Sequence, residues 1–441
     1  MGRARRLCKE LDKMRRAGQL NKYEQTDELK EYLYQKIMER MDMTVSVSDR
    51  ELMELIDEVI VKESKKRYIT LPMKYRYRQE LFDSFRRLDV LSEAIDDSDV
   101  TEIMVNGANQ IFIEKNGRIQ KFDKVFSSEE KLEDVIQQIA SRVNRRVNEV
   151  TPMADARLED GSRVNIVLPP IALDGPIVTI RRFSKEPIRM EQLIAWNSIS
   201  REAADDLADL VRSGYNIFVC GGTGSGKTTF LGALAEFIPP DERVITIEDS
   251  AELKLVNVKN LVRLETRPAN LEGKHEITIR QLIRNALRMR PDRIIVGEVR
   301  SEEALDMIQA MCTGHQGSMS TGHANSSQDM LSRLETMVLM GMDLPLAAIR
   351  GQIASALDII VYLGRLRDKS RHVIEIDEIE GIKDGKIRLN KLYSWQEEGE
   401  RDGKIIGKLV RIQTVLHREK LWAAGYRLSE LCDGSISMDT L

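Results

Sequence analysis

Hydrophobic positions recur with three different spacings along the 441 residues of the chain. In roughly the first 95 residues, apolar side chains repeat every three or four positions, which is the spacing of one face of an α-helix. Three helices are predicted in this region, over Thr26–Met43, Ser48–Ser64 and Lys74–Asp96. Residues 1–95 are therefore expected to form a helical N-terminal extension.

From about residue 100 the spacing changes to two, which is the period of a β-strand. Short strands are predicted over Glu102–Asn106, Gln110–Glu114 and Arg118–Phe122. Asn116-Gly117, between the second and the third, is a strong signal for a hairpin turn. A helix over Ser128–Asn144 and a strand over Pro176–Phe183 follow. A small α+β N-terminal domain is predicted for residues 96–184, and residues 185–200 are expected to be a linker.

Beyond residue 200, strands that are apolar throughout alternate with helical stretches. The predicted strands are Asn216–Cys220, Val244–Ile247, Arg293–Val296, Gly317–Thr321 and Ile359–Leu363. This alternation predicts an α/β domain over residues 201–380, with a parallel sheet covered by helices on both faces. A hairpin (Val373–Ile379, a turn at Lys383-Asp384-Gly385, Lys386–Trp395) and a polar tail are expected to complete the chain, with residues 381–441 as the C-terminal segment.

Composition narrows the function classes. Lys and Arg number 67 against 71 Asp and Glu, so the net charge of −4 gives no general reason to expect nucleic-acid binding. The four cysteines show no metal-binding spacing, which favours a reducing cytosol. No apolar run reaches the roughly 20 residues that a membrane helix needs, and no signal peptide is recognised. A membrane role is therefore expected from the cytoplasmic side and through partners. The basic residues among positions 3–16 favour a solvated helical face over contact with anionic lipid.

One segment carries a complete phosphate-binding motif. Residues 221–228 read G-G-T-G-S-G-K-T, which matches G-x-x-x-x-G-K-[ST] in full between a predicted strand and a predicted helix, Thr229–Phe237. Backbone N–H groups of such a loop surround the β-phosphate, Lys227 is expected to bridge the β- and γ-phosphates, and the Thr228 hydroxyl is expected to bind Mg²⁺. The predicted nucleotide-binding residues are Gly221, Gly222, Thr223, Gly224, Ser225, Gly226, Lys227, Thr228 and Thr229.

Hydrolysis also needs carboxylates, one set to hold Mg²⁺ and one to orient the attacking water. Two strand ends supply them. Glu298 follows the apolar run that starts at Arg293, and Glu248, Asp249 and Glu252 follow the strand that starts at Val244. Ligands of open α/β sheets bind at the carboxyl ends of the strands. The predicted Mg²⁺ residues are Thr228, Glu248, Asp249 and Glu298.

These motifs resemble the type II/type IV secretion ATPases, which drive type II secretion, type IV pili and type IV secretion. Four family motifs occur in order: the Walker A loop, an Asp box at Thr246–Glu252, a Walker B segment at Gly297-Glu298 and a His box at Ser320–Asn325. The likeness covers about residues 95–380 and is closest to the ATPase of tight-adherence (Flp) pili. That closeness rests on Thr101–Gly107, Asp155–Asn165, Arg263–Pro268 and Leu287–Arg293. Cys312 and Gly322 depart from the family pattern and put only fine geometry in doubt.

The resemblance implies a fold and a set of roles. It implies a RecA-like ATPase domain preceded by a smaller, PAS-like α+β domain. Glu252 would polarise the attacking water, Glu298 would act through a Mg²⁺-bound water, and His323 would sense the γ-phosphate. Glu248 and Asp249 would support Glu252 and the Mg²⁺ shell. Arg157 and Arg163 of the N-terminal domain would reach the γ-phosphate as that domain closes, with Arg181 and Arg182 as weaker candidates.

The resemblance further implies a homo-hexameric ATPase that uses ATP and Mg²⁺. It would work at the cytoplasmic face of the inner membrane with a membrane platform protein, through which it would move pilins or secreted proteins. Three alternatives stay open: a conjugation-type secretion ATPase, a DNA-handling motor, which the charge balance disfavours, and a nucleotide-gated scaffold that hydrolyses little. The joint presence of Glu252, Glu298 and His323 argues against the scaffold. A zinc site is not expected either, because the spacing of Cys312, His315 and His323 fits no common zinc pattern.

Overall fold

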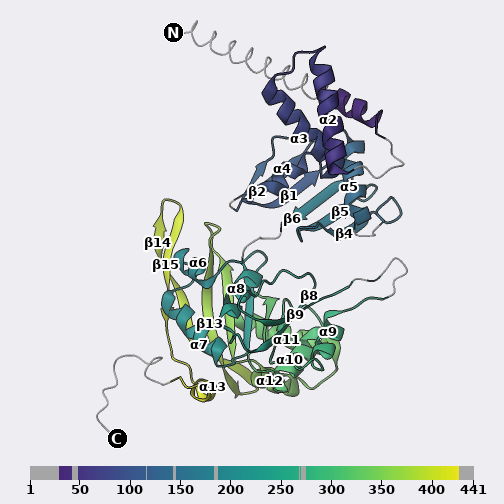
Figure 1. The fold of residues 1–441 in the computed structure, drawn as a ribbon. Helices are drawn as coiled ribbons and strands as arrows, with labels where there is room; N and C mark the ends of the chain where they lie inside the picture. Colours follow the sequence, from purple (N-terminus) through teal and green to yellow (C-terminus); the bar gives the residue numbers. More distant parts are fainter. Residues whose placement is uncertain are drawn as a thin grey trace, which may run out of the picture. The chain divides into compact units, whose positions relative to one another are not determined.

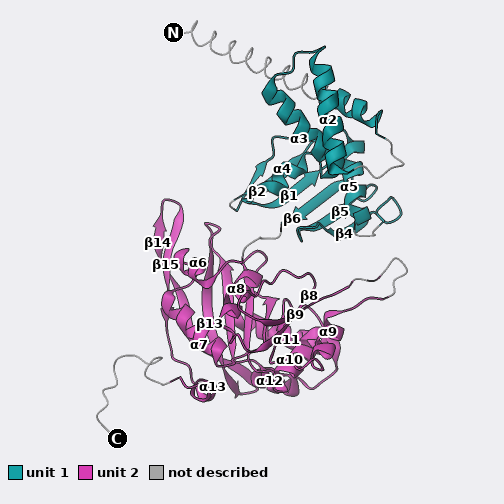
Figure 2. Ribbon diagram, viewed as in Figure 1, with its two compact units in different colours: residues 1–184 teal, residues 185–441 magenta. Residues whose placement is uncertain are grey.

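The computed structural model describes residues 29–41, 48–115, 117–142, 146–182, 187–267, 269 and 275–426. The chain divides into two compact units, Met1–Ser184 and Lys185–Leu441 (Figure 2). Each unit contains its own β-sheet (Figure 1). The parts of the predictions that fall on residues 1–28, 42–47, 116, 143–145, 183–186, 268, 270–274 and 427–441 lie outside the described residues.

The first unit begins with helices that have a core of their own. Residues 29–38 are helical and are followed by α2 (Asp49–Ser64), α3 (Leu71–Arg86) and α4 (Leu91–Asp96). Ser48 and Thr70 cap the N-termini of α2 and α3 through their hydroxyls. Buried side chains of the first three helices form a separate cluster that includes Leu33, Ile56, Tyr77 and Leu81. The prediction of helices from the three- and four-residue spacing is confirmed for this region.

The single predicted helix Lys74–Asp96 is wrong, because the structure has two separate helices over this range. The structure ends α3 at Arg86 and begins α4 at Leu91. Asp89, between them, has a φ of 49°, which breaks a right-handed helix. Its carboxylate accepts hydrogen bonds from the Ser84 hydroxyl and, at 3.2 Å, from Lys30 Nζ. These contacts stabilise a bend that the apolar spacing does not report.

The rest of the first unit is a six-stranded antiparallel sheet in the order β3-β2-β1-β6-β5-β4. Its strands are β1 (Val100–Asn106), β2 (Ile111–Lys115), β3 (Arg118–Lys121), β4 (Met153–Arg157), β5 (Arg163–Val167) and β6 (Ile177–Arg181). Helix α5 (Glu129–Arg142) shares one core cluster with the buried side chains of the sheet. The predicted β2–β3 hairpin is confirmed, whereas the β4–β5 hairpin was not predicted from the sequence.

The second unit is built on a nine-stranded sheet in the order β15-β14-β13-β12-β7-β11-β10-β8-β9. Its strands are β7 (Ile217–Gly221), β8 (Arg243–Glu248), β9 (Asn260–Glu265), β10 (Arg293–Val296), β11 (Met319–His323), β12 (Ile359–Arg365), β13 (Arg371–Lys383), β14 (Lys386–Arg401) and β15 (Lys404–Arg411). Strands β12, β7, β11, β10, β8 and β9 pair in parallel, and β13 to β15 extend the sheet antiparallel. All five predicted strands are confirmed, and so is the α/β fold class.

Helices cover both faces of this sheet, as predicted. One core cluster joins it to α6 (Met190–Ala195), α7 (Arg201–Arg212) and α8 (Lys227–Leu234). The other joins it to α9 (Ile279–Ala286), α10 (Glu303–Cys312), α11 (Ser327–Gly341) and α12 (Leu346–Ala356). Within the described ranges, no single helix is long and apolar enough to cross a bilayer; α11 and α12 meet that criterion only as a pair, with a bend of 118° between them.

Three elements of the second unit differ from the sequence expectation. The stretch 185–200, expected as a linker, contains α6, whose Met190 and Leu193 are buried in the core. The polar tail contains β15, and β9 was also missed. Both are edge strands, and β15 is buried on alternate positions only. A strand with one polar face has the polar composition of a loop, and for this reason these two strands were not predicted from the sequence.

A buried arginine anchors the start of the Walker B strand. Arg293 is 2% exposed; its guanidinium forms a forked contact with the Glu242 carboxylate and donates to the Val211 carbonyl at 2.6 Å. It also occupies the space where a side chain at residue 317 would begin, because a Cβ on Gly317 would lie 2.5 Å from Arg293 Nη1. The start of β10 is therefore fixed by an ion pair within the second unit.

Replacing Arg293 by Met is expected to lower the free energy of unfolding by about 3 kcal/mol, because the ion pair between the buried guanidinium and the half-buried Glu242 is broken and the Val211 carbonyl loses its donor. Urea denaturation followed by tryptophan fluorescence measures this change, since Trp196, Trp395 and Trp422, the three tryptophans of the chain, all belong to the second unit. Arg212→Met is the control, because its ion pair with Asp209 is a surface pair worth at most about 1 kcal/mol. Equal effects of the two variants would contradict the anchor.

Candidate nucleotide site

The phosphate-binding motif forms a loop between β7 and α8. Strand β7 ends at Gly221, and α8 begins at Lys227 with Gly226 at its N-cap. Gly226 has a φ of 94°, a left-handed conformation that favours glycine. At Gly221 a side chain is excluded for a different reason, because its Cβ would collide with the Leu363 carbonyl of the neighbouring strand β12. Both glycines are thus required by the local geometry of the loop.

The Lys227 ammonium lies against the backbone carbonyls of this loop. Its Nζ donates to the carbonyls of Gly221 at 3.2 Å and Gly222 at 3.1 Å, and it lies 3.3 Å from Nδ1 of His323. The ammonium and the positive N-terminus of α8 both favour an anion at this point. The arrangement fits the phosphates of a nucleotide.

The sheet order brings the predicted site residues of the second unit to one edge. Strands β7, β11, β10 and β8 are parallel neighbours, so their carboxyl ends meet there. His323 at the end of β11 pairs in register with Gly221 at the end of β7. Glu298 follows β10 by two residues, and Glu248 ends β8. The His box, the Walker B segment and the Asp box therefore lie beside the phosphate loop.

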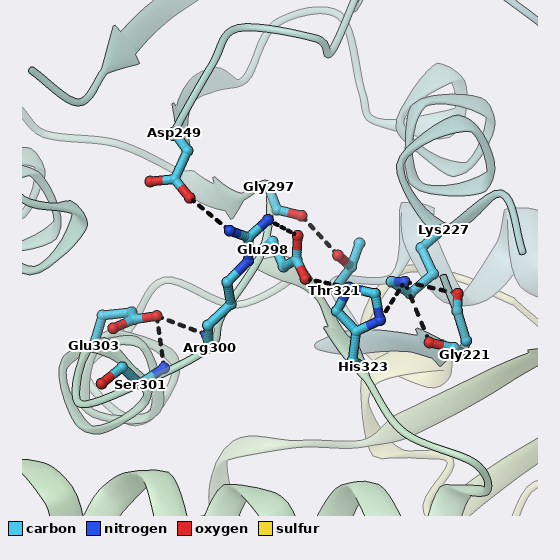
Figure 3. A network of polar contacts seen from close by, with 11 residues as sticks. Gly221, Lys227, Asp249, Gly297, Glu298, Arg300, Ser301, Glu303, Thr321 and His323 are labelled. Carbon is cyan, nitrogen blue, oxygen red and sulfur yellow. Dashed lines mark hydrogen bonds and ion pairs between the residues drawn. The ribbon is translucent and has the colours of Figure 1, made fainter. Parts of the chain in front are cut away.

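A continuous set of polar contacts links these motifs (Figure 3). Nε2 of His323 lies 2.8 Å from Oε1 of Glu298. The other Glu298 oxygen accepts from Arg300 Nη2 at 2.6 Å, and Arg300 Nη1 lies 3.5 Å from an Asp249 oxygen. The contacts thus run from Lys227 through His323, Glu298 and Arg300 to Asp249.

The charges of Glu298 and His323 follow from these neighbours. Burial alone would raise the pKa of Glu298, but the Arg300 hydrogen bond and the positive charges around it outweigh burial and hold that pKa below its ordinary value. Burial, followed by the Lys227 ammonium, lowers the pKa of His323 even though Glu298 opposes the shift. Because an ammonium can only donate, Nδ1 of the neutral His323 ring accepts from Lys227, which assigns the ring proton to Nε2, the nitrogen nearer Glu298.

Replacing His323 by Gln is expected to make stability less sensitive to acid. The pKa of His323 in the folded protein lies below its ordinary value of 6.5, so the unfolded chain binds a proton at higher pH than the folded protein does. Protonation of His323 in the unfolded chain therefore lowers the free energy of unfolding only below pH 6.5, and the loss grows as the pH falls toward the pKa of the folded protein. Urea midpoints measured from about pH 8 to about pH 5 should fall less in His323→Gln than in wild type. Identical slopes would show that His323 is not held neutral.

Glu248 has a different environment from the other acids. It is 3% exposed, and one of its oxygens accepts from the backbone N–H groups of Glu252 at 2.8 Å and Leu253 at 2.9 Å. Burial raises its pKa, although the two N–H groups oppose that shift. A Cβ on Gly297 would lie 2.9 Å from Glu248 Cγ, so the close approach of the Walker B turn depends on glycine. Glu248 therefore holds the turn that carries Glu252.

The oxygen ligands expected for Mg²⁺ fit that cation chemically. The Thr228 hydroxyl is in the first turn of α8, and Glu298 and Asp249 supply carboxylates at the same edge of the sheet. Glu248, the fourth residue expected at Mg²⁺, instead uses one oxygen to hold the backbone N–H groups of Glu252 and Leu253. Mg²⁺ keeps several of its waters and needs few protein carboxylates. Within the part of the chain that the structure describes, no group of three or more His, Cys, Asp or Glu side chains is arranged to hold a metal ion by itself.

Two arginines of the site were missed from the sequence. Arg300 joins Glu298 to Asp249, and Arg371, the first residue of β13, donates from Nε to the Gly224 carbonyl of the phosphate loop at 2.8 Å. Arg300 follows Glu298 by two positions, so its charge next to the Walker B acid was a usable signal. Arg371 is 147 residues away from Gly224 in the sequence, and no local signal could have found it.

The arginines predicted in the N-terminal domain lie in the first unit. Arg157, Arg163 and Arg181 pair in register across β4, β5 and β6, so they form one row on one face of the sheet. Their strand neighbours Val164 and Ile180 are buried in the core, which places the row on the opposite face. Arg182 points elsewhere and donates to the carbonyls of Asp97 and, at 3.0 Å, Val100. The structure thus groups Arg157 with Arg163 and gives Arg182 contacts within its own unit.

Comparison with known proteins finds relatives among conjugal transfer and type IV secretion proteins. A putative conjugal transfer protein of Mycobacterium tuberculosis is 35% identical over 293 residues, which is 65% of this chain and 83% of that protein. The type IV secretion system protein PtlH of Bordetella pertussis is 32% identical, over 67% of this chain and 95% of its own length. The crystal structure of the VirB11 ATPase from the Brucella suis type IV secretion system is 31% identical over 67% of this chain and 97% of that one, with a TM-score of 0.36.

The family match covers most of the chain. Residues 86–408 match the family described as "Type II/IV secretion system protein", and they include every predicted site residue. The matched range begins within the helices of the first unit and ends in β15. The chain therefore belongs to the type II/IV secretion system protein family.

Proposed function

We propose that this protein is an ATP-hydrolysing motor that drives pilus assembly or protein secretion through a membrane platform protein. The observation that carries the proposal is the set of contacts from Lys227 to Asp249, which joins a complete phosphate loop to the two acid-bearing strand ends. Family membership supports the assignment to a secretion or pilus machine.

Each part of the site has a role in the proposed reaction. Residues 221–229 hold the phosphates of ATP, with Lys227 at the β- and γ-phosphates. Thr228, Glu298 and Asp249 hold Mg²⁺, which neutralises charge on the phosphates when it is bound. Glu252 polarises the attacking water, and Glu248 fixes the turn that positions Glu252 through the two N–H bonds described above.

His323 is proposed to report the state of the γ-phosphate. Its ring lies between the Lys227 ammonium and the Glu298 carboxylate. A γ-phosphate that attracts Lys227 weakens the contact with His323 Nδ1, and the imidazole then reorients relative to Glu298. The γ-phosphate can thereby change contacts at the end of β11, and α11 follows directly after it along the chain.

Arg157 and Arg163 are proposed to reach the γ-phosphate from the N-terminal domain during closure. A guanidinium stays charged and forms forked hydrogen bonds with phosphate oxygens, so it stabilises the charge of the transition state. Domain closure that depends on ATP does work because the two arrangements bind ATP and ADP with different affinity. The motor is proposed to act as a homo-hexamer at the cytoplasmic face of the membrane, without direct contact with nucleic acid.

The relatives favour a second branch of the same superfamily. The names of the M. tuberculosis and B. pertussis relatives refer to conjugal transfer and type IV secretion. The closer likeness to the Flp pilus ATPase remains a prediction from the sequence. Both branches use the same chemical residues, so the proposed reaction is the same in either case.

The deciding experiment measures ATP hydrolysis by the purified full-length protein, together with its mass by light scattering with and without nucleotide. Wild type is expected to hydrolyse ATP and to reach the mass of a ring, and Lys227→Ala is expected to lose both ATP binding and turnover. Lys259→Ala, which removes an exposed lysine of the same unit, is the matched control. If wild type binds ATP as a monomer and never turns it over, the motor is excluded in favour of a nucleotide-gated scaffold.

A further inference from the structure

The corner between α2 and α3 exposes three large apolar side chains close together. Tyr68, Leu71 and Tyr75 are 90%, 64% and 66% exposed. Leu71 and Tyr75 are four residues apart on α3 and therefore share one side of the helix, with Tyr68 in the turn just before it. The buried Tyr77 and Leu81 belong to the core cluster on the other side of α3. The packing of the helices thus leaves this apolar group without a role in the core.

Positive charge surrounds the same corner. The basic residues between positions 61 and 76 are Lys62, Lys65, Lys66, Arg67, Lys74 and Arg76. The one acid in that stretch is Glu63, which is buried and contacts Lys66 at 3.1 Å, so six basic residues less one acid leave a charge of +5. The Arg67 guanidinium lies 4.4 Å from the centre of the Tyr32 ring. The surface is therefore both basic and apolar.

Charge is segregated along α2. Of its exposed acids, Asp49, Glu51 and Glu54 lie in the N-terminal half of the helix and Glu58 lies one turn before Lys62, whereas Lys62 and the basic residues after it lie at the C-terminal end. An anionic surface is consequently attracted to the corner and repelled by the opposite end of α2. This asymmetry orients the helix pair with respect to such a surface.

We propose that the α2–α3 corner, residues 61–76, is a contact surface for anionic lipid. Tyrosine and leucine side chains enter the headgroup layer while lysine ammonium groups remain at the level of the lipid phosphates. Four of the six basic residues are lysines, which act as hydrated point charges, whereas binding of a shaped protein carboxylate favours the fork of arginine. The composition therefore favours a lipid surface over an acidic protein. This inference does not depend on the proposed ATP hydrolysis.

Sedimentation of the full-length protein with vesicles tests the proposal. Wild type is expected to bind phosphatidylcholine vesicles that contain phosphatidylglycerol, to bind pure phosphatidylcholine vesicles much less, and to dissociate as salt is raised. Lys62→Gln with Lys65→Gln is expected to weaken binding about 25-fold, because each lysine near an anionic surface contributes about fivefold. Tyr68→Ser with Tyr75→Ser is expected to weaken binding without a change of charge.

Strand β3 provides matched controls in the same unit. Arg118→Gln with Lys121→Gln makes the same change of charge at exposed positions, and Ile119→Ser removes an exposed apolar side chain there. Circular dichroism and thermal unfolding verify that every variant is folded, without recourse to ATPase activity. The proposal is overturned if wild type does not bind anionic vesicles, if β3 and corner variants lose binding equally, or if the corner variants bind as well as wild type. The last result would show that vesicles bind another segment of the chain, and the corner would then be a candidate contact for a protein partner.

Discussion

Glu252→Gln is expected to lower the rate of ATP turnover by about 10²- to 10⁴-fold while ATP binding stays within about twofold of wild type. Glutamine keeps the shape of the side chain but does not polarise or accept a proton from the attacking water. The hydrogen bond from the backbone N–H of Glu252 to Glu248 is kept in this variant. A coupled assay gives the turnover, and a fluorescent ATP analogue gives the binding.

Two further variants separate the roles of neighbouring acids. Glu276→Gln alters an exposed acid of the same unit and should leave turnover unchanged. Glu248→Ala removes the acceptor of two backbone hydrogen bonds, so it should lower stability by about 1–3 kcal/mol as well as turnover. If Glu248→Ala leaves stability intact and raises the Mg²⁺ concentration required, Glu248 is a metal residue rather than a support. Turnover by Glu252→Gln at the wild-type rate would remove Glu252 from the chemistry.

Arg157→Ala and Arg163→Ala are each expected to reduce ATP turnover about 10³-fold or more, the size of effect measured for arginines that contact the transferred phosphate. The two residues are directly paired on β4 and β5 in a row of guanidinium groups. Arg163→Lys should also be defective, because lysine keeps the charge but lacks the planar fork. Turnover is measured with saturating ATP, and light scattering measures the assembly.

The control for the arginine variants comes from the same sheet. Arg118→Ala removes an exposed arginine of β3 and should leave turnover unchanged. Assembly mass equal to that of wild type would show that the arginines act on the reaction rather than on ring formation. If Arg157→Ala and Arg163→Ala both retain turnover within about threefold of wild type, domain closure does not deliver these arginines to the γ-phosphate.

The sequence alone determined the parts of this protein that depend on short stretches of chain. The phosphate loop is eight consecutive residues, and its glycines specify their own backbone conformation, so it was found in full. Five of the six parallel strands were found, four of them as mainly apolar runs, and Glu298 and the Asp-box acids were found because they lie at or just after the ends of two such runs. Local spacing also located the hairpins β2–β3 and β13–β14. In each case the signal and the structure occupy the same few residues.

Only the tertiary structure decided which of these parts touch. Lys227 meets His323 because β11 lies between β7 and β10, and Arg371 meets Gly224 because β13 extends the sheet beside β12. The buried pair of Arg293 and Glu242 likewise joins residues that are 51 positions apart. Elements with one polar face, such as β9, β15 and α6, acquire their form by packing against that sheet. Strand order and the burial of one face are properties of the assembled sheet, and no local period of apolar residues encodes them.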